Sequence, residues 1–206
     1  MFEKVLEETS STFNGRVKVV RTLGLGTYIQ VDGLTQSGGV VEGIWKETLK
    51  KLRHKTINKC LILGLGGGTA AKLVRKYWPE AEIVGVDIDP VMVEMGKKYL
   101  GLGEVKVEIK IGDAEDFIKS KYDLVIADLY RGFEYPAKFE KPKFLRMVKS
   151  LLSKDGVAIF NHLYSEGKRT EAIKFGKKVE ETFSKIEWYY PSANLMFICK
   201  EPGSLG

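Results

Sequence analysis

The chain is poor in the residues that build disulfide frameworks and metal centres. It has two cysteines and two histidines among 206 residues, and their spacing matches no common metal-binding pattern. Cys60 and Cys199 each stand inside an apolar, strand-like run, so we expect both to be buried as small hydrophobic side chains. These shortages argue against a disulfide-stapled fold, and we predict no metal ligand.

Long hydrophobic runs are also missing. No apolar stretch approaches the roughly 20 residues that a membrane-spanning helix needs. The first residues, MFEKVLEETSSTFNG, lack the positive-then-apolar pattern of a secretion signal. We therefore expect a cytoplasmic protein with no membrane partner.

The net charge of +6 raises the question of a nucleic-acid surface. The lysines are scattered, however, and many stand near glutamates, as in KETLKKLRHK and KFGKKVEETFSK. This pattern favours a solvated surface over a nucleic-acid partner.

From residue 59 onward, strand and helix patterns alternate. Strands are expected at 59–66, 81–89, 105–113, 122–129, 157–163, 186–190 and 194–201, and helices at 69–78, 90–100, 141–152 and 167–183. This alternation predicts an α/β fold with a doubly wound, mainly parallel seven-stranded sheet. The last two strands are joined around Pro191 too tightly for a crossover helix, so one of them should run antiparallel.

A smaller unit precedes this sheet. Residues 16–33 contain two β-favouring stretches around a glycine turn and predict a β-hairpin. Residues 40–54 carry apolar side chains at helical spacing. We therefore divide the chain into an N-terminal β-hairpin unit (1–39), a linking helix (40–58) and a Rossmann-like domain (59–206). An isolated hairpin is marginally stable and must pack on something, so it is a candidate dimer element.

The stretch CLILGLGGGTAAKLV joins an apolar strand to an amphipathic helix through a glycine loop. Gly64, Gly66, Gly67 and Gly68 would let the backbone approach a ligand closely. No Lys-Ser/Thr pair follows them, which excludes a P-loop, and Thr69 replaces the third glycine of the dinucleotide pattern. The loop alone also fits a simple strand–helix turn.

Two acidic positions strengthen the case for a ligand. Asp87, followed by Ile88, ends the second strand about 20 residues after the loop, where an acid can bind ribose hydroxyls. Asp113, followed by Ala114, ends the third strand, where an acid can accept from an adenine amino group. Either acid could instead cap a helix. Because nothing basic adjoins the loop, the pattern favours S-adenosylmethionine or a relative over a nucleotide with phosphates.

Several motifs give the chain a family resemblance. NGRVKVV, VDGLTQS, DIDP, GDA and YDLVIADLYRG occur in this order between Asn14 and Leu163. With them the chain resembles the spermidine synthase family, and more closely its methyltransferase-fold relatives. The resemblance implies a class I methyltransferase fold, an adenosyl donor, a homodimer or tetramer, and a catalytic loop beginning at Asp128. It also implies that Gln36, Glu42 and Trp45 bind the substrate.

Two departures from the family pattern bear on the reaction. Spermidine synthases carry acids where Gly67 and Arg131 stand here. Carboxylates should bind the ammonium groups of an aminopropyl donor and its diamine acceptor, so these losses weaken the polyamine hypothesis.

Our first hypothesis is therefore methyl transfer from S-adenosylmethionine to a small-molecule acceptor. Asp128 and Tyr130 would be catalytic, with Asp128 also near the donor. Arg131 would line the acceptor side or meet the methionyl carboxylate.

The alternative is aminopropyl transfer from decarboxylated S-adenosylmethionine to a polyamine. In that case the segment 133–142 would form either a mobile lid or a fixed connection. A third hypothesis is an adenosyl-binding module without catalysis, or an RNA methyltransferase that uses the basic surface.

Overall fold

The computed structural model describes residues 3–116 and 120–200. Its larger sheet contains β5 (Lys59–Leu63), β6 (Glu82–Asp87), β7 (Glu108–Ile111), β8 (Tyr122–Ala127), β9 (Leu152–Leu163), β10 (Lys185–Tyr189) and β11 (Asn194–Lys200). The helices are α1 (Gly39–Lys50), α2 (Thr69–Tyr77), α3 (Pro90–Tyr99), α4 (Pro142–Ser150) and α5 (Arg169–Glu180), with the 3₁₀ turns η1 (Leu102–Glu104) and η2 (Ala137–Glu140). Among these residues, no helix is both long and apolar enough to cross a membrane.

The larger sheet has the strand order β10-β11-β9-β8-β5-β6-β7. Its pairs are parallel from β9 through β8, β5 and β6 to β7, whereas β11 runs antiparallel to both of its neighbours. The predicted seven-stranded, mainly parallel sheet with an antiparallel terminal strand is confirmed. Glu201, the last residue of the predicted final strand, lies outside the described residues.

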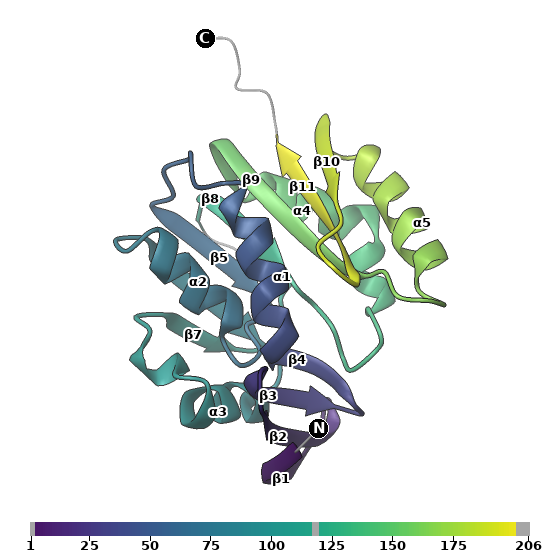
Figure 1. Cartoon of the computed structure of the whole chain (residues 1–206). Coiled ribbons are helices and arrows are strands. Elements are labelled where there is room, and N and C mark those ends of the chain that lie inside the picture. Colours follow the sequence, from purple (N-terminus) through teal and green to yellow (C-terminus); the bar gives the residue numbers. More distant parts are fainter. Residues whose placement is uncertain (1–2, 117–119, 201–206) are drawn as a thin grey trace.

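Helices cover both faces of this sheet, with α1 and α2 on one side and α4 and α5 on the other (Figure 1). Successive side chains of a strand point to opposite faces. On β5, Cys60 and Ile62 accordingly pack in the α1–α2 core, and Leu61 and Leu63 pack in the α4–α5 core. Cys60 and Cys199 are fully buried, as predicted.

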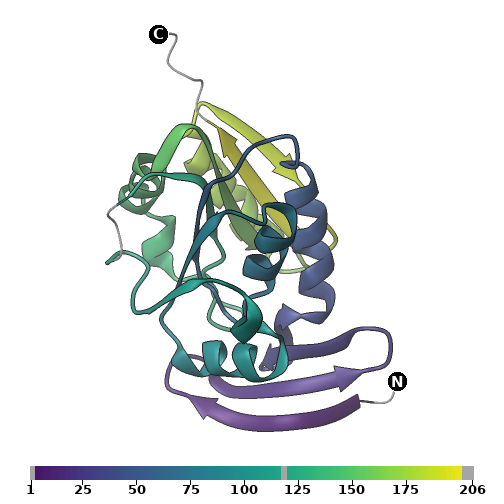
Figure 2. The same ribbon diagram turned by 90° about the vertical axis from the view of Figure 1, so that its left-hand side faces the viewer.

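The N-terminal unit is larger than the predicted hairpin. It is a four-stranded antiparallel sheet of β1 (Glu3–Ser11), β2 (Gly15–Thr22), β3 (Gly26–Val31) and β4 (Leu34–Gly38). The predicted hairpin is β2–β3, and it gains a strand on each side. Figure 2 shows this sheet lying along α3. The two share an apolar core, made of Val17, Val19, Ile29, Val31, Met92, Met95 and Leu100.

A polar contact fixes the turn between β1 and β2 to the main domain. Asp89 is completely buried, and its Oδ1 accepts from the N–H of Val91 at 2.9 Å, which caps α3. Its Oδ2 accepts from Ser11 Oγ at 2.5 Å and from Asn14 Nδ2 at 2.7 Å. One carboxylate therefore both starts α3 and holds the β1–β2 turn at the carboxyl edge of the main sheet.

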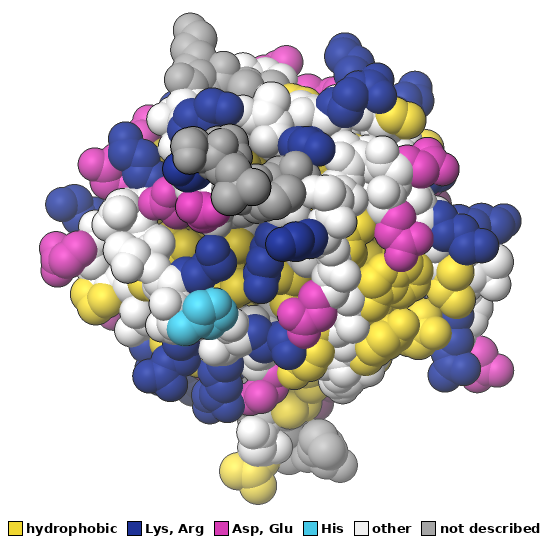
Figure 3. All heavy atoms as spheres, turned by 90° about the horizontal axis from the view of Figure 1, so that it is seen from above, with side chains coloured by type: hydrophobic (Ala, Val, Ile, Leu, Met, Phe, Trp, Pro, Cys, Tyr) yellow, Lys and Arg dark blue, Asp and Glu magenta, His cyan; other side chains and the backbone are white. Residues whose placement is uncertain are grey.

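The surface charges are interleaved. On the face shown in Figure 3, Lys and Arg side chains alternate with Asp and Glu side chains. Across the described residues several charged side chains form ion pairs, such as Lys59 with Glu82 at 3.2 Å and Lys51 with Glu187 at 2.7 Å. Exposed pairs of this kind add little stability.

Candidate functional site

A pocket of about 850 Å³, counted with its open mouth, lies at the carboxyl ends of β5, β6, β7 and β8. Ligands bind at this edge of open α/β sheets, and the size suits a small molecule. The N-terminal sheet and the β1–β2 turn form one wall through Asn14, Gln36 and Ser37. The segment after β8 forms another wall through Pro136 and Phe139.

The glycine loop between β5 and α2 borders this pocket. Gly64 and Leu65 donate their N–H groups to Val86 O. Gly66 N donates to Asp87 Oδ2 at 2.6 Å, and Gly67 N donates to Ser37 Oγ at 2.8 Å. The N–H of Gly68 bonds Leu65 O within the loop. All five loop amides thus have partners, so the loop is a poor cradle for phosphate groups.

Two of the four predicted loop glycines border the pocket. Gly64 and Gly66 line it, and at Gly64 the chain turns with φ +86° so close to the Asp128 carbonyl that a Cβ would overlap it. Gly67 and Gly68 do not line the pocket. Gly67 packs against the N-terminal sheet and the loop after α3, because a Cβ there would lie 2.7 Å from Ile29 Cδ1 and 2.9 Å from Leu100 Cδ1.

Asp87 stands at the carboxyl end of β6 and lines the pocket beside Ile88. Its Oδ2 accepts from Gly66 N and its Oδ1 from Asp89 N at 2.8 Å. Each carboxylate oxygen can accept a second bond, so both retain capacity for ligand hydroxyls. Burial raises the pKa of Asp87 to about 6, although its backbone hydrogen bonds oppose this shift.

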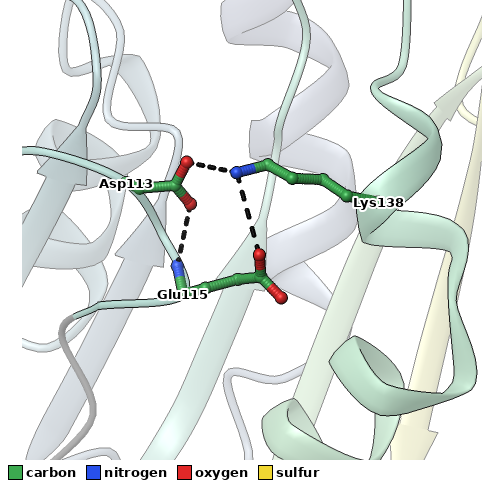
Figure 4. A network of polar contacts seen from close by, with 3 residues as sticks. All are labelled: Asp113, Glu115 and Lys138. Atoms are coloured by element: carbon green, nitrogen blue, oxygen red, sulfur yellow. Dashed lines mark hydrogen bonds and ion pairs between the residues drawn. The ribbon is translucent and has the colours of Figure 1, made fainter.

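Asp113 also lines the pocket, next to Ala114, and it is bound by a lysine (Figure 4). Lys138 from η2 contacts the Asp113 carboxylate and lies 3.8 Å from Glu115. Partial burial raises the pKa of Asp113, but the Lys138 contact, the Glu115 N–H and the charge of Arg131 outweigh it, so the pKa is lowered. The ion pair ties η2, and with it the wall after β8, to the end of β7.

Asp128 follows β8 and is half-buried at the pocket. Its Oδ2 accepts from Trp45 Nε1 at 3.1 Å and its Oδ1 from Asn161 Nδ2 at 2.8 Å. Burial raises its pKa to about 6, and these two hydrogen bonds oppose the shift. Both donors are neutral, so a carboxylate lies at the pocket without a cationic partner among the described residues.

Tyr130 and Arg131 follow on the same loop and line the pocket. Tyr130 Oη accepts from Leu163 N at 2.6 Å, which holds the ring against the end of β9. Arg131 is exposed, forms a backbone bridge with Glu134, and its guanidinium lies 5.9 Å from the Phe13 ring on the β1–β2 turn.

Of the predicted substrate-binding residues, Gln36, Trp45 and Arg131 line the pocket. Gln36 Nε2 also donates to Gly132 O at 3.1 Å, which links β4 to the loop after β8. Glu42 is not brought to the pocket. It is exposed near the start of α1 and borders a separate groove beside Lys72. Its side chain projects about 100° around the helix from that of Val41, which does line the pocket.

An aromatic cluster lies behind Tyr130. His162 stacks on Phe175 at 4.0 Å between ring centroids and contacts the Tyr135 ring at 4.1 Å. Burial lowers the pKa of His162 to about 3, so its ring is neutral. His162 Nε2 and Tyr135 Oη are buried without a hydrogen-bond partner in the described part of the chain.

Several site residues were not predicted. Asn14 lines the pocket from the β1–β2 turn, and Lys138 contacts Asp113 from η2. Neither residue was assigned a role in the site from the sequence. Asn161 and Asn194 form a chain of hydrogen bonds to Asp128. A signal for Asn161 does exist, since it is the polar residue that directly follows the apolar run VAIF near the carboxyl end of β9.

Comparison with known proteins finds one matching family model and curated relatives of two kinds. The family described as "Spermine/spermidine synthase domain" matches residues 47–195. A polyamine aminopropyltransferase of Aeropyrum pernix is 32% identical over 172 residues, which are 76% of this chain and 54% of that protein. An eEF1A lysine and N-terminal methyltransferase of Mus musculus is 30% identical over 154 residues, 68% of this chain and 22% of that protein.

The solved structures agree at the level of the fold. Spermidine synthase from Thermotoga maritima superposes with a TM-score of 0.78 and 20% identity, covering 97% of this chain and 74% of that one. The chain spans about half the length of the first curated relatives that it matches.

Proposed function

The chain belongs to the spermine/spermidine synthase domain family, and we propose that it is an aminopropyltransferase that uses decarboxylated S-adenosylmethionine and a polyamine acceptor. Relatives named polyamine aminopropyltransferase support this alternative over our first hypothesis of methyl transfer. Asp128 carries the proposal, because it is a carboxylate with neutral partners at the ligand edge of the sheet.

The residues present fit an adenosyl donor. Asp87 retains acceptor capacity for ribose hydroxyls, Asp113 lies at the next strand end for an adenine amino group, and the wall includes the apolar Met92 and Phe139. When bound, the donor would supply a sulfonium whose attached carbon is open to attack, so positioning is the main task of the protein.

Asp128 would act on the acceptor. An attacking amine must be unprotonated, and a carboxylate with a pKa of about 6 can attract the ammonium form and receive its proton. Below this pKa the carboxylate is itself protonated and can do neither. The rate of transfer should therefore fall as the pH drops through about 6.

A second candidate is methyl transfer to an amine from intact S-adenosylmethionine. Gly67 supports it, because no acid stands in the loop and a Cβ there would meet Ile29 and Leu100. Arg131 also supports it, since a guanidinium at the pocket suits a carboxylate-bearing donor. The similarity to the mouse eEF1A methyltransferase fits an amine acceptor for this reaction as well.

Two measurements separate these candidates. Calorimetric titration with both forms of the donor should show tighter binding of decarboxylated S-adenosylmethionine. Mass spectrometry of reactions with putrescine and spermidine should then show addition of an aminopropyl group. Binding of the intact donor alone, with methyl addition to an amine, would replace our first proposal with the second. Binding of neither would refute the adenosyl pocket.

The role of Asp128 is tested by Asp128→Asn. We expect transfer to fall roughly 100- to 10,000-fold while donor binding changes little, because Asp87 and Asp113 remain. Asp123→Asn is the matched control. Asp123 lies at the start of β8, at the end far from Asp128, and its carboxylate accepts hydrogen bonds from Asn58 N and Ser153 Oγ. Equal losses in both variants would show that Asp128 has only a structural role. The cytoplasmic location and the homodimer remain predictions.

A further inference from the structure

Asp128 stands at the end of a buried line of side-chain amides. Asn161 Nδ2 donates to Asp128 Oδ1 at 2.8 Å, and Asn194 Nδ2 donates to Asn161 Oδ1 at 2.7 Å. Both asparagines are buried, with 5% and 6% of their surface exposed. The line runs from the end of β8 across the neighbouring strands β9 and β11, so the sheet itself sets its geometry.

The direction of these bonds matters because an asparagine amide has two different ends. Its NH₂ group donates to a carboxylate, whereas its oxygen would repel one. The donor from Asn194 occupies Asn161 Oδ1 and so keeps the NH₂ group turned toward Asp128. Asn194 therefore acts on Asp128 indirectly, by fixing the orientation of the Asn161 side-chain amide.

We propose that Asn161 and Asn194 are positioning residues that hold the Asp128 carboxylate charged and correctly turned toward the acceptor amine. This rests on the proposed function only in its last part, the acceptor. The effect on the carboxylate itself holds whichever group is transferred.

The electrostatic balance at Asp128 supports the assignment. Burial raises its pKa to about 6, and the Asn161 bond is the first of two interactions that lower it, the other coming from Trp45 on α1. The titratable groups whose charges interact with Asp128 are Asp87 beside the glycine loop, and Tyr130 and Tyr135 after β8. None of them is a cation, so the Asn161 amide and the Trp45 indole N–H are the groups that favour the charged form.

The test is a titration of the Asp128 carboxyl group that does not depend on the reaction. Side-chain ¹³C-labelled aspartate is followed by NMR against pH, and the signal missing from Asp128→Asn identifies residue 128. In Asn161→Leu, we expect the pKa of Asp128 to rise by about one unit, a roughly tenfold change in the acid dissociation constant. The pH below which the transfer rate falls should rise by the same amount.

Thr48→Val is the matched control. It also deletes one buried side-chain hydrogen bond, from Thr48 Oγ1 to Ile44 O, but that bond lies within α1. We expect a comparable loss of stability with no shift in the Asp128 titration. If Asn161→Leu is destabilised in the same way and Asp128 titrates as in the wild type, Asn161 is merely structural and the proposal is wrong.

Asn194→Leu provides an independent variant that leaves the Asn161 donor in place. It should raise the pKa of Asp128 by releasing the Asn161 amide, and an unchanged titration would overturn the role of Asn194. In the wild type, the Asn161 side-chain amide signals should also shift with the Asp128 titration, which requires no variant. A shifted titration in a protein that transfers no group would refute the proposed function and leave the positioning role standing.

Discussion

At the scale of single residues, the most informative position is Gly67. The absence of an acid there was visible in the sequence, but the reason that even a small side chain does not fit was not. Ile29, Leu100 and Ser37 occupy the space around it, all within 3 Å of where a Cβ would stand. The loss of the acid therefore goes together with the packing of the N-terminal sheet against the glycine loop.

This packing predicts opposite effects of one substitution at two glycines. Gly67→Ala should destabilise the protein by about 1–3 kcal/mol, because it overpacks a closed site. Gly43→Ala, in the exposed face of α1 with nothing within 4 Å of the added Cβ, should stabilise it by roughly 0.5–1 kcal/mol through helix propensity. Urea unfolding measures both. Equal stability of Gly67→Ala and the wild type would mean that the site has room for a side chain.

At the scale of elements, α3 and the β1–β2 turn depend on one residue. Asp89 offers one oxygen to the α3 cap and the other to Ser11 and Asn14. Asp89→Asn keeps a good cap, since Asn and Asp are equivalent there, but it places an NH₂ group against two donors. The variant therefore loosens the turn while the helix start is kept.

We expect Asp89→Asn to increase amide hydrogen exchange in residues 8–14 and to weaken adenosyl-donor binding several-fold, because Asn14 lines the pocket. Thr12→Ala, an exposed change in the same turn, should do neither. Unchanged exchange at the turn would show that Asp89 is not its anchor. Increased exchange with unchanged donor affinity would show that the turn is no part of the binding site.

The elements differ in how well the sequence predicts them. Core strands such as β5 and β8 are continuous apolar runs, and helices such as α2 carry a clear 3.6-residue period, so both were predicted. The strand β1 was missed because its sequence, EKVLEETSS, is mostly polar and it is largely exposed. Its place depends on pairing with β2, and pairing of this kind has no local signal.

The same reasoning applies to the site in the whole molecule. The parallel sheet brings strand ends together, so Asp87, Asp113 and Asp128 could be placed at one edge from the chain order alone. Lys138 and Asn194 could not, because their partners are set by tertiary packing between distant segments. Glu42 was assigned by resemblance, and the orientation of α1 turns it to a different groove.

The N-terminal sheet and the main domain should unfold as one unit. Their shared core combines β2 and β3 with α3, and the apolar side chains of all three elements in this core would be exposed to water if the two parts separated. We expect a single thermal transition with equal calorimetric and van't Hoff enthalpies. Ile29 in the N-terminal sheet and Leu124 in the main sheet are both fully buried. Ile29→Ala and Leu124→Ala should each lower the free energy of unfolding by about 2–5 kcal/mol and move that one transition to a lower temperature.

Leu23→Ala is the control, because Leu23 is 87% exposed and its truncation should leave the transition unchanged. Two separate transitions, with Ile29→Ala moving only one of them, would show that the N-terminal sheet folds independently of the main domain. A single transition would mean instead that the N-terminal sheet unfolds together with the main domain, including the glycine loop that packs on Ile29 and Ser37. Pocket and sheet would then be lost together on heating, and a bound donor should raise the temperature of that one transition.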